Sequence, residues 1–359
     1  MDQNIKSVNF IGDGIGFSPE EYIEKLSEIN RSDKIHRDIY GNGGPTKSLE
    51  EEFAKITGKE KCIYLPTGTM ANHLSVRLLN GENIKVIVPE NSHMYRDEAD
   101  GLYSVHRKRL IPVGKGKPYF ELEDLKETLD YLKSGETFDS GTGTVVIENP
   151  VRRADGKYVP IETIKEISEY CREKGYKLHL DGARIHLASA YTNTPISEYS
   201  SYFDTVYISL YKCLNTAGGA VLCGDSELID MVPYQIKIHG GTVFQSWSNT
   251  AMAFHYLKDI ESKWQKIIPL SKHLINEINK IKGISIEKIK NGTNNFNLVP
   301  DENIDLNKFS DFLGKEYKIY LGRIEDTGII KFTVNESLFR RELNDILNVW
   351  KMGIEISIR

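Results

Sequence analysis

Three short segments of this sequence place polar or reactive residues directly after an apolar run. The first, Pro66–Asn72 (PTGTMAN), follows the run Cys62–Leu65 and contains Gly68 and Thr69. Small residues at the start of a helix leave its free backbone N–H groups open to an anion such as a phosphate. The same residues are equally compatible with an ordinary strand-to-helix turn.

The second segment, His179–Arg184 (HLDGAR), places a carboxylate at the end of an apolar strand. Ligands gather outside the carboxyl ends of strands in open α/β sheets. Asp181 is therefore a candidate ligand-binding acid, and Arg184 is either its ion-pair partner or a clamp for a carboxylate. A rival interpretation takes His179, Asp181 and His186 as metal ligands, but His186 begins the next helix or loop rather than sharing the strand face.

The third segment places Lys212 directly after the apolar run 205–210. Desolvation lowers the pKa of a lysine and makes its amine a nucleophile for aldehydes. Taken alone, Lys212 is compatible with a surface lysine. Together, the three segments supply what pyridoxal phosphate requires, namely an anion site, a carboxylate for the pyridine nitrogen and an amine for a Schiff base.

The elements that must position these residues alternate along the chain. Apolar runs predict strands at 62–65, 85–88, 144–147, 176–180 and 205–210, and a period of three to four residues predicts a helix over 161–174. Such alternation is typical of βαβ units in a mostly parallel sheet with helices on both faces.

After residue 250 the pattern changes. It predicts a long helix over 251–282, helices at 306–313 and 337–350, and short strands at 285–286, 296–298, 319–321 and 329–332. The sequence therefore predicts an α/β protein with a large, mostly parallel sheet domain over residues 1–250 and a smaller C-terminal α/β domain over residues 251–359.

The composition excludes several classes of protein. The 359 residues include 46 basic and 51 acidic side chains, a net charge of −5 that is too balanced for a nucleic-acid coat or a polybasic membrane binder. No apolar run approaches the length of a membrane span, the start lacks the pattern of a signal peptide, and the four cysteines form no CxxC motif. We expect a soluble cytoplasmic protein with no nucleic-acid or membrane partner and no metal.

Five segments occur in an order that resembles one family. These are YGNGGPTKSLEEEF, LPTGTMAN, ENSHMYRDEADG, HLDGAR and SLYK. They resemble the threonine aldolases, pyridoxal-phosphate enzymes of the aspartate-aminotransferase fold (fold type I) that are grouped with the β-eliminating lyases. The resemblance covers most of residues 8–250 and is weak in the C-terminal third.

The resemblance implies an aldolase that cleaves a β-hydroxy-α-amino acid of the threonine type to glycine and an aldehyde. Another pyridoxal-phosphate reaction on an amino acid, such as β-elimination, decarboxylation, racemisation or transamination, is the alternative within the same class. A metal hydrolase that uses the His179 set, or an inactive binding protein on the same fold, are the alternatives outside it.

The resemblance also implies roles for individual residues. Lys212 would form the Schiff base, Asp181 would pair with the pyridinium nitrogen, and His93 would stack on the ring and is the first candidate for the base, with a water molecule as the second. The other implied contacts are Gly68, Thr69 and Ser209 at the phosphate, and Glu148, Asn149 and Arg184 near the ring.

Three positions depart from the family's pattern. Gly12 stands where a serine is usual, and Phe244 stands where an arginine would reach the phosphate across a dimer. Lys331 stands where a late arginine would clamp the substrate carboxylate, and a lysine cannot form a bidentate fork. The carboxylate would then be bound by Arg184 together with Lys331 or Arg323.

The resemblance implies a homodimer or homotetramer as well. In such enzymes the segments that correspond to Tyr40–Pro45 and Gly240–Gln245 reach the site of the neighbouring subunit.

Overall fold

The computed structural model describes residues 5–359, which form two compact units. One unit comprises Ile23–Lys258, and the other comprises residues 5–22 together with 259–359. The N-terminal segment thus groups with the C-terminal residues, whereas the sequence placed it in the large domain. Residues 1–4 lie outside the described residues. They belong to the range predicted for the large domain and to the start that was compared with a signal peptide.

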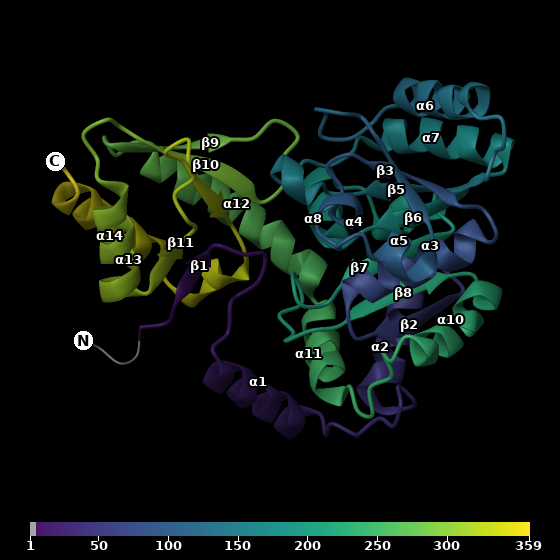
Figure 1. Cartoon of the computed structure of the whole chain (residues 1–359). Helices are drawn as coiled ribbons and strands as arrows, with labels where there is room; N and C mark the ends of the chain where they lie inside the picture. The colour runs from purple at the N-terminus through teal and green to yellow at the C-terminus, as the bar shows by residue number, and fades with distance from the viewer. Residues whose placement is uncertain (1–4) are drawn as a thin grey trace. The chain divides into compact units, whose positions relative to one another are not determined.

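The larger unit is built on a seven-stranded sheet (Figure 1). The strand order is β2-β8-β7-β6-β5-β3-β4, in which β3 to β7 run parallel, while β8 runs antiparallel to both β7 and β2. The strands are β2 (Lys61–Leu65), β3 (Lys85–Pro89), β4 (Arg109–Val113), β5 (Thr142–Glu148), β6 (Lys177–Asp181), β7 (Thr205–Ser209) and β8 (Ala220–Gly224). The predicted α/β fold with a mostly parallel sheet is confirmed.

Helices pack against this sheet or against one another (Figure 1). They are α2 (Gly44–Thr57), α3 (Gly68–Asn80), α4 (His93–Arg96), α5 (Gly101–His106), α6 (Leu122–Gly135), α7 (Ile161–Lys174), α8 (Ile185–Thr192), α9 (Ile196–Ser201), α10 (Ser226–Ile238) and α11 (Trp247–Leu257), with a 3₁₀ turn η1 (Arg152–Ala154). Helix α1 (Pro19–Ser32) begins in the smaller unit and continues into the larger one. Helix α7 has the predicted bounds, because its apolar period and Gly175 define both its buried face and its end.

Helix α3 contacts six strands of the sheet, β2, β3, β5, β6, β7 and β8. Its Leu74 packs with Tyr207, Leu222 and Val232 in a buried apolar cluster. This packing fixes the first turn of α3 beside the carboxyl ends of β6 and β7, where the predicted ligand-binding residues lie.

The smaller unit holds two small sheets. Strand β1 (Val8–Phe10) pairs parallel with β11 (Ile319–Leu321), and β12 (Ile330–Thr333), β10 (Asn295–Pro300) and β9 (Ile284–Lys288) form an antiparallel sheet. Its helices are α12 (Ile260–Ile278), α13 (Leu306–Tyr317) and α14 (Leu343–Ile356), with a 3₁₀ turn η2 (Glu336–Arg340).

The N-terminal strand belongs to the core of the smaller unit. The ring of Phe10 stacks on Phe332 with 4.2 Å between centroids, and the buried Trp350 meets both rings edge-on. Asn335 donates its side-chain N–H to the carbonyls of Asn9 and Gly12, each at 2.7 Å. Aromatic burial and these hydrogen bonds explain why residues 5–22 do not join the larger unit.

Two helices predicted for the C-terminal part have the wrong bounds, because each is interrupted in the structure. The helix expected over 251–282 is two helices, α11 and α12, and the break between them falls where the larger unit ends and the smaller one begins. The helix expected over 337–350 is the short η2 followed by α14, and Ser337 in η2 accepts the backbone N–H of Asn9 at 2.8 Å. None of the helices over residues 5–359 combines the length and apolar composition of a bilayer span.

Candidate active site

A cavity of about 370 Å³ opens at the first turn of α3 and the carboxyl ends of β5, β6 and β7. Parallel strands bring their carboxyl ends to one edge, and the register places Glu148 beside Asp181 and Asp181 beside Tyr207. The cavity is lined by Pro66, Thr67, Gly68, Thr69, His93, Glu98, Glu148, Asp181, Ala183, Arg184, Tyr207, Tyr211, Lys212, Ala217, Gly218 and Gly219. Seven residues predicted from the sequence are thus brought together.

The first turn of α3 is open toward the cavity. Thr67 caps the helix by accepting the backbone N–H of Met70 at 3.2 Å, while Gly68 and Thr69 line the cavity. A Cβ on Gly68 would collide with the Tyr207 hydroxyl, so the turn requires glycine. The free N–H groups and the positive end of this helix suit an anion.

Ser209 lies two residues after Tyr207 on the same face of β7, just outside the cavity lining. Its side chain is 1% exposed, and its Oγ has no well-aligned hydrogen-bond partner among the described residues. The Tyr207 side chain is a polar neighbour of Ser209, and a ligand oxygen could give this buried hydroxyl a better aligned hydrogen bond.

Asp181 ends β6 as a buried acid. Its Oδ1 accepts the backbone N–H of Ala183 at 3.2 Å, and its Oδ2 accepts the side-chain amide of Asn72 at 3.0 Å. Burial raises the pKa of this carboxyl, whereas the nearby charge of Lys212 lowers it. A further positive group in the cavity would therefore stabilise the ionised form of Asp181.

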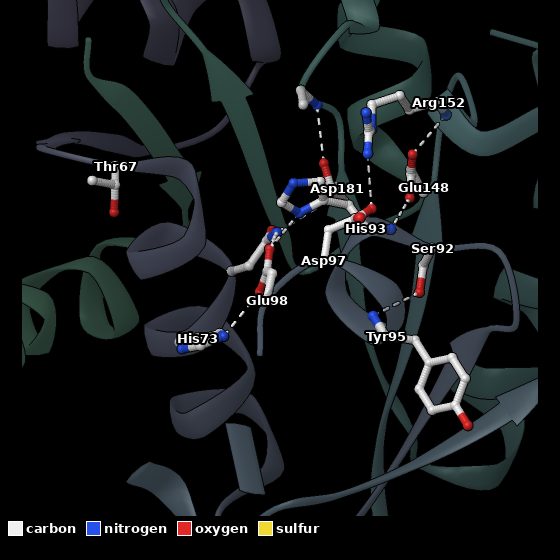
Figure 2. Close-up of polar contacts among 12 residues, drawn as sticks. Thr67, His73, Ser92, His93, Tyr95, Asp97, Glu98, Glu148, Arg152 and Asp181 are labelled. Atoms are coloured by element: carbon white, nitrogen blue, oxygen red, sulfur yellow. Dashed lines mark hydrogen bonds and ion pairs between the residues drawn. The ribbon is translucent and has the colours of Figure 1, made fainter. Parts of the chain in front are cut away.

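Glu148 ends the neighbouring strand β5 and anchors two turns. Its Oε2 accepts the backbone N–H of His93 at 2.6 Å, and its Oε1 accepts that of Arg152 at 2.8 Å (Figure 2). Burial and the charge of Asp181 raise the pKa of Glu148, while these N–H groups and Arg184 oppose that rise. Glu148 thus fixes where α4, and with it His93, begins.

His93 and Glu98 form a close pair at the other wall of the cavity. His93 Nδ1 lies 2.8 Å from Glu98 Oε1, and the Glu98 side chain is fully buried (Figure 2). The hydrogen bond to Glu98 raises the pKa of His93, although burial opposes it. The protonated imidazole of His93 is therefore more stable at this position than it would be in water.

Glu98 has two further partners on α3. Asn72 donates its side-chain N–H to Oε1 at 2.9 Å, and His73 Nε2 lies 2.9 Å from Oε2. The geometry at Oε2 is poorly aligned for a hydrogen bond, so the contact with His73 is mainly electrostatic. Burial by itself would raise the pKa of Glu98, but His73 and His93 outweigh it and lower the pKa below its usual value.

His179 orients the amide of Asn72. Its Nδ1 lies 2.9 Å from the hydroxyls of Ser75 and Thr205, and its Nε2 lies 3.0 Å from Asn72 Oδ1. Burial lowers the pKa of His179 to about 3, so the ring is neutral and donates through Nε2. The amide N–H groups of Asn72 are then directed to Asp181 and Glu98.

This network does not assemble the metal site considered from His179, Asp181 and His186. Both nitrogens of His179 are taken up by its neighbours, and His186 lies buried on α8, where its ring packs near Phe53. His93, Glu98 and Asp181 do bring ligand-type atoms within 4.8 Å of one another. Those atoms already bind each other or Asn72, so we assign them to the hydrogen-bond network.

Lys212 and Arg184 supply the positive charges of the cavity. Lys212 is half-buried, and its Nζ lies 5.4 Å from the centre of the Tyr211 ring. Arg184 directly precedes α8 and is half-buried. Its positive charge opposes the rise in the pKa of Glu148. Lys212 and Arg184 both line the same cavity as the carboxylates of Glu148 and Asp181.

Three predicted residues lie outside the cavity lining in addition to Ser209. Asn149 is fully buried, and its Oδ1 accepts the backbone N–H of Val159 at 2.9 Å, so it supports a loop. Lys331 and Arg323 belong to the smaller unit, where Lys331 Nζ donates to Asn297 Oδ1 at 2.9 Å and Arg323 is exposed.

Sequence reasoning missed Glu98, Asn72 and Tyr207. Glu98 lies in the charged run RDEAD, which reads as a solvated surface, and Tyr207 lies in an apolar strand. The alternation of β7 could have placed Tyr207 on the face of Ser209. The burial of Glu98 depends on packing against α3, which no local pattern shows.

Comparison with known proteins finds a matching family and several similar enzymes. The sequence profile of the β-eliminating lyases matches residues 20–301. A low-specificity L-threonine aldolase of Candida albicans is 34% identical over 219 residues, covering 60% of this chain and 58% of that protein. Its counterpart in Saccharomyces cerevisiae is 30% identical over 255 residues, covering 69% and 64%. The chain therefore matches less than two thirds of the length of either relative.

Solved structures extend the likeness to the whole chain. A provisionally assigned L-allo-threonine aldolase of Listeria monocytogenes superposes with a TM-score of 0.79 and 25% identity, covering 98% of this chain and 96% of that one. A threonine aldolase of Leishmania major, at 15% identity, has the same fold with a TM-score of 0.72, over 96% and 98% of the two chains. Because the family profile spans most of the chain, and the fold and motif order agree with it, this protein belongs to the β-eliminating lyase family.

Proposed function

We propose that this protein is a pyridoxal-phosphate-dependent lyase that cleaves a β-hydroxy-α-amino acid of the threonine type to glycine and an aldehyde. The observation that carries the proposal is that one cavity is lined by the first turn of α3, Asp181, Lys212 and His93. It joins an anion site, a buried acid, an amine and a proton acceptor. Membership of the family and the names of the relatives support the same activity.

The residues around the cavity fit this cofactor. The open N–H groups at Gly68 and Thr69 suit a phosphate, and so does the buried Ser209 hydroxyl near Tyr207, which has no well-aligned hydrogen bond among the described residues. Asp181 is placed to bind a protonated ring nitrogen, and Lys212 shares the same lining. Bound pyridoxal phosphate supplies an electron sink for the charge left at Cα when a bond to that carbon breaks.

The chain's own residues have separate tasks in this proposal. Lys212 contributes the amine that attaches the cofactor, and Asp181 keeps the ring nitrogen protonated. Arg184 binds the substrate carboxylate or the ring oxygen, with Lys331 or Arg323 as the second cation for the carboxylate. His93 accepts the proton of the β-hydroxyl, and a water molecule is the second candidate for that base.

We also propose a homodimer or homotetramer in the cytoplasm. The backbone N–H of Tyr40 donates to the carbonyl of Phe244 at 2.9 Å, and both aromatic side chains are more than half exposed. A paired, apolar and exposed surface of this kind favours contact with a second copy. The buried thiols of the four cysteines are consistent with a reducing compartment.

Borohydride labelling tests the cofactor assignment. The holoenzyme is expected to be yellow, and reduction should bleach that colour and leave a phosphopyridoxyl mass on the peptide that carries Lys212. Lys212→Ala should remain folded but lose turnover, whereas Lys61→Ala, which removes a surface lysine paired with Asp230, should behave as wild type. An adduct on another lysine would contradict the assignment.

Product analysis tests the reaction. The purified holoenzyme is incubated with a panel of amino acids, and aldehyde, glycine, pyruvate and ammonia are measured. The proposal expects aldehyde and glycine in equal amounts from β-hydroxy-α-amino acids. Pyruvate with ammonia would instead indicate β-elimination, and loss of carbon dioxide would indicate decarboxylation.

A further inference from the structure

We propose that Glu98 is the positioning residue that makes His93 a base, with His73 as the second partner of the same carboxylate. The inference deepens the proposed function and rests on it, because it concerns the proton that leaves the β-hydroxyl. It follows from three polar contacts around one buried side chain, that of Glu98.

The first step concerns which nitrogen of His93 can accept a proton. An ionised carboxylate only accepts hydrogen bonds, so the nitrogen that faces Glu98 Oε1 at 2.8 Å, Nδ1, carries a hydrogen. In the neutral ring this leaves Nε2 with the free lone pair. Since the ring lines the cavity, Nε2 is the atom available to a substrate hydroxyl.

The second step concerns how Glu98 stays charged and in place. Its side chain is fully buried, yet it meets three polar groups, namely Asn72 Nδ2, His73 Nε2 and His93 Nδ1. Asn72 and His73 are consecutive residues of α3, and each meets a different oxygen of the Glu98 carboxylate. A Cβ on Gly101 would collide with the His73 ring, so close packing against Gly101 also holds that ring in position.

The charges around the pair are mixed. His93 faces Glu98, Asp181 and Glu148, and it shares the cavity lining with Lys212 and Arg184. The negative charge of Glu98 also contributes a rise to the pKa values of Asp181, His179 and Tyr207.

His73 has an uncharged neighbour on its other side. The His106 ring lies there at 5.6 Å between centroids. Burial, together with the charges of His73, His239, Arg77 and Lys108, lowers the pKa of His106 to about 4, so that ring is neutral near pH 7.

The proton transfer from the substrate hydroxyl to His93 balances over one turnover. The O–H bond of the substrate breaks, an N–H bond forms at His93 Nε2, and the resulting imidazolium lies against the negative Glu98. One proton leaves the hydroxyl and one proton reaches Cα of glycine in each turnover, so the pair returns to its starting charge. No oxidant or other co-reactant is needed.

The test has two readouts, the titration of His93 and the pH profile of turnover. The full-length chain, labelled in its histidines, is titrated by NMR without cofactor, and His93 is assigned with a His93→Gln variant. Glu98→Gln is expected to lower the pKa of His93 by one unit or more and to remove the preference for a hydrogen on Nδ1. Glu98→Asp should restore part of both, and Glu90→Gln, which removes a carboxylate paired with Arg96, should change neither.

The holoenzymes of the same variants are then compared in turnover. Glu98→Gln is expected to reduce kcat by about 10²-fold or more, the usual contribution of a positioned base, and to move the acid limb of the profile to lower pH. His73→Gln should give a smaller change in the same direction. A purely structural role would lower stability without moving the profile.

The outcomes separate this inference from the proposed function. Unchanged titration of His93 in Glu98→Gln overturns the pairing even if the enzyme is an active aldolase. A clear shift of that titration in a protein that releases no aldehyde from any substrate supports the pairing and overturns the proposed aldolase reaction.

Discussion

Asp181 is the residue on which the proposed electron sink depends. Asp181→Asn keeps the shape and a carbonyl oxygen for Asn72, but an amide cannot keep a ring nitrogen protonated. We expect kcat to fall by about 10²-fold or more, the scale seen when one charge-stabilising group of a catalytic site is removed. The thermal midpoint should change little in comparison.

The control for this variant is Asp230→Asn, because Asp230 is a surface acid paired with Lys61. Steady-state kinetics and thermal unfolding of both variants check the prediction. An unchanged kcat in Asp181→Asn would contradict the whole placement of the cofactor.

We predict that the second cation for the substrate carboxylate is Lys331 or Arg323. A carboxylate in a desolvated site requires a paired cation. If Lys331 is the partner, Lys331→Ala should raise KM by roughly 10- to 150-fold, or about 1.5–3 kcal/mol, and Arg323→Ala should be nearly silent. Lys331→Arg should lower KM, because a guanidinium forms the bidentate fork that an ammonium cannot.

Measured KM values for threonine decide between the two cations. The opposite pattern, with Lys331→Ala silent and Arg323→Ala impaired, would assign the role to Arg323. Silence in both would mean that the substrate presents no carboxylate to this part of the chain, and the aldolase proposal would have to be replaced by another pyridoxal-phosphate reaction.

At the scale of elements, the first turn of α3 connects stability with ligand binding. Gly68 leaves room for the Tyr207 hydroxyl, and an added Cβ would overlap that ring. Although alanine favours a helix over glycine, overpacking of this kind costs about 1–3 kcal/mol and should dominate. We therefore expect Gly68→Ala to lower the free energy of unfolding and to weaken cofactor binding at least tenfold.

Urea unfolding and cofactor titration check this prediction, and Gly135→Ala at the end of α6 is the matched control, because a Cβ there meets no atom within 4 Å. If Gly68→Ala bound the cofactor as tightly as wild type, the phosphate would have to lie elsewhere.

At the scale of the molecule, the exposed surface around Tyr40 and Phe244 should mediate self-association. These side chains are 58% and 57% exposed, and Val243 beside them is 40% exposed. Tyr40→Ser combined with Phe244→Ser should move the protein toward a monomer in sedimentation velocity, because apolar burial drives such contacts. Turnover should fall with it if the two segments complete a neighbour's site.

Phe138→Ser is the control for that double variant, since Phe138 is 91% exposed and lies in a different segment, between α6 and β5. A wild-type protein that is monomeric and active at working concentration would refute the predicted oligomer.

The sequence by itself determined five of the seven strands of the large sheet and most of the cavity, whereas β4 and β8 were not predicted. Apolar runs of β-branched residues mark β5 and β7, and the residue after each run must lie at the carboxyl end of a strand. Parallel strands align those ends, so Asp181, Glu148 and Lys212 could be expected to meet. These features depend on local patterns and on one rule of topology, and both can be read along the chain.

Only the tertiary structure decided how the charges in the cavity are paired. Glu98 lies in a run of charged residues, yet it is buried against Asn72 and His73, which precede it by 26 and 25 positions. Likewise, β1 pairs with β11, more than 300 residues away, and so places the N-terminal segment in the smaller unit. Burial and pairing between distant segments depend on which surfaces remain apolar after the elements have formed, and that information is not contained in any one segment of the sequence.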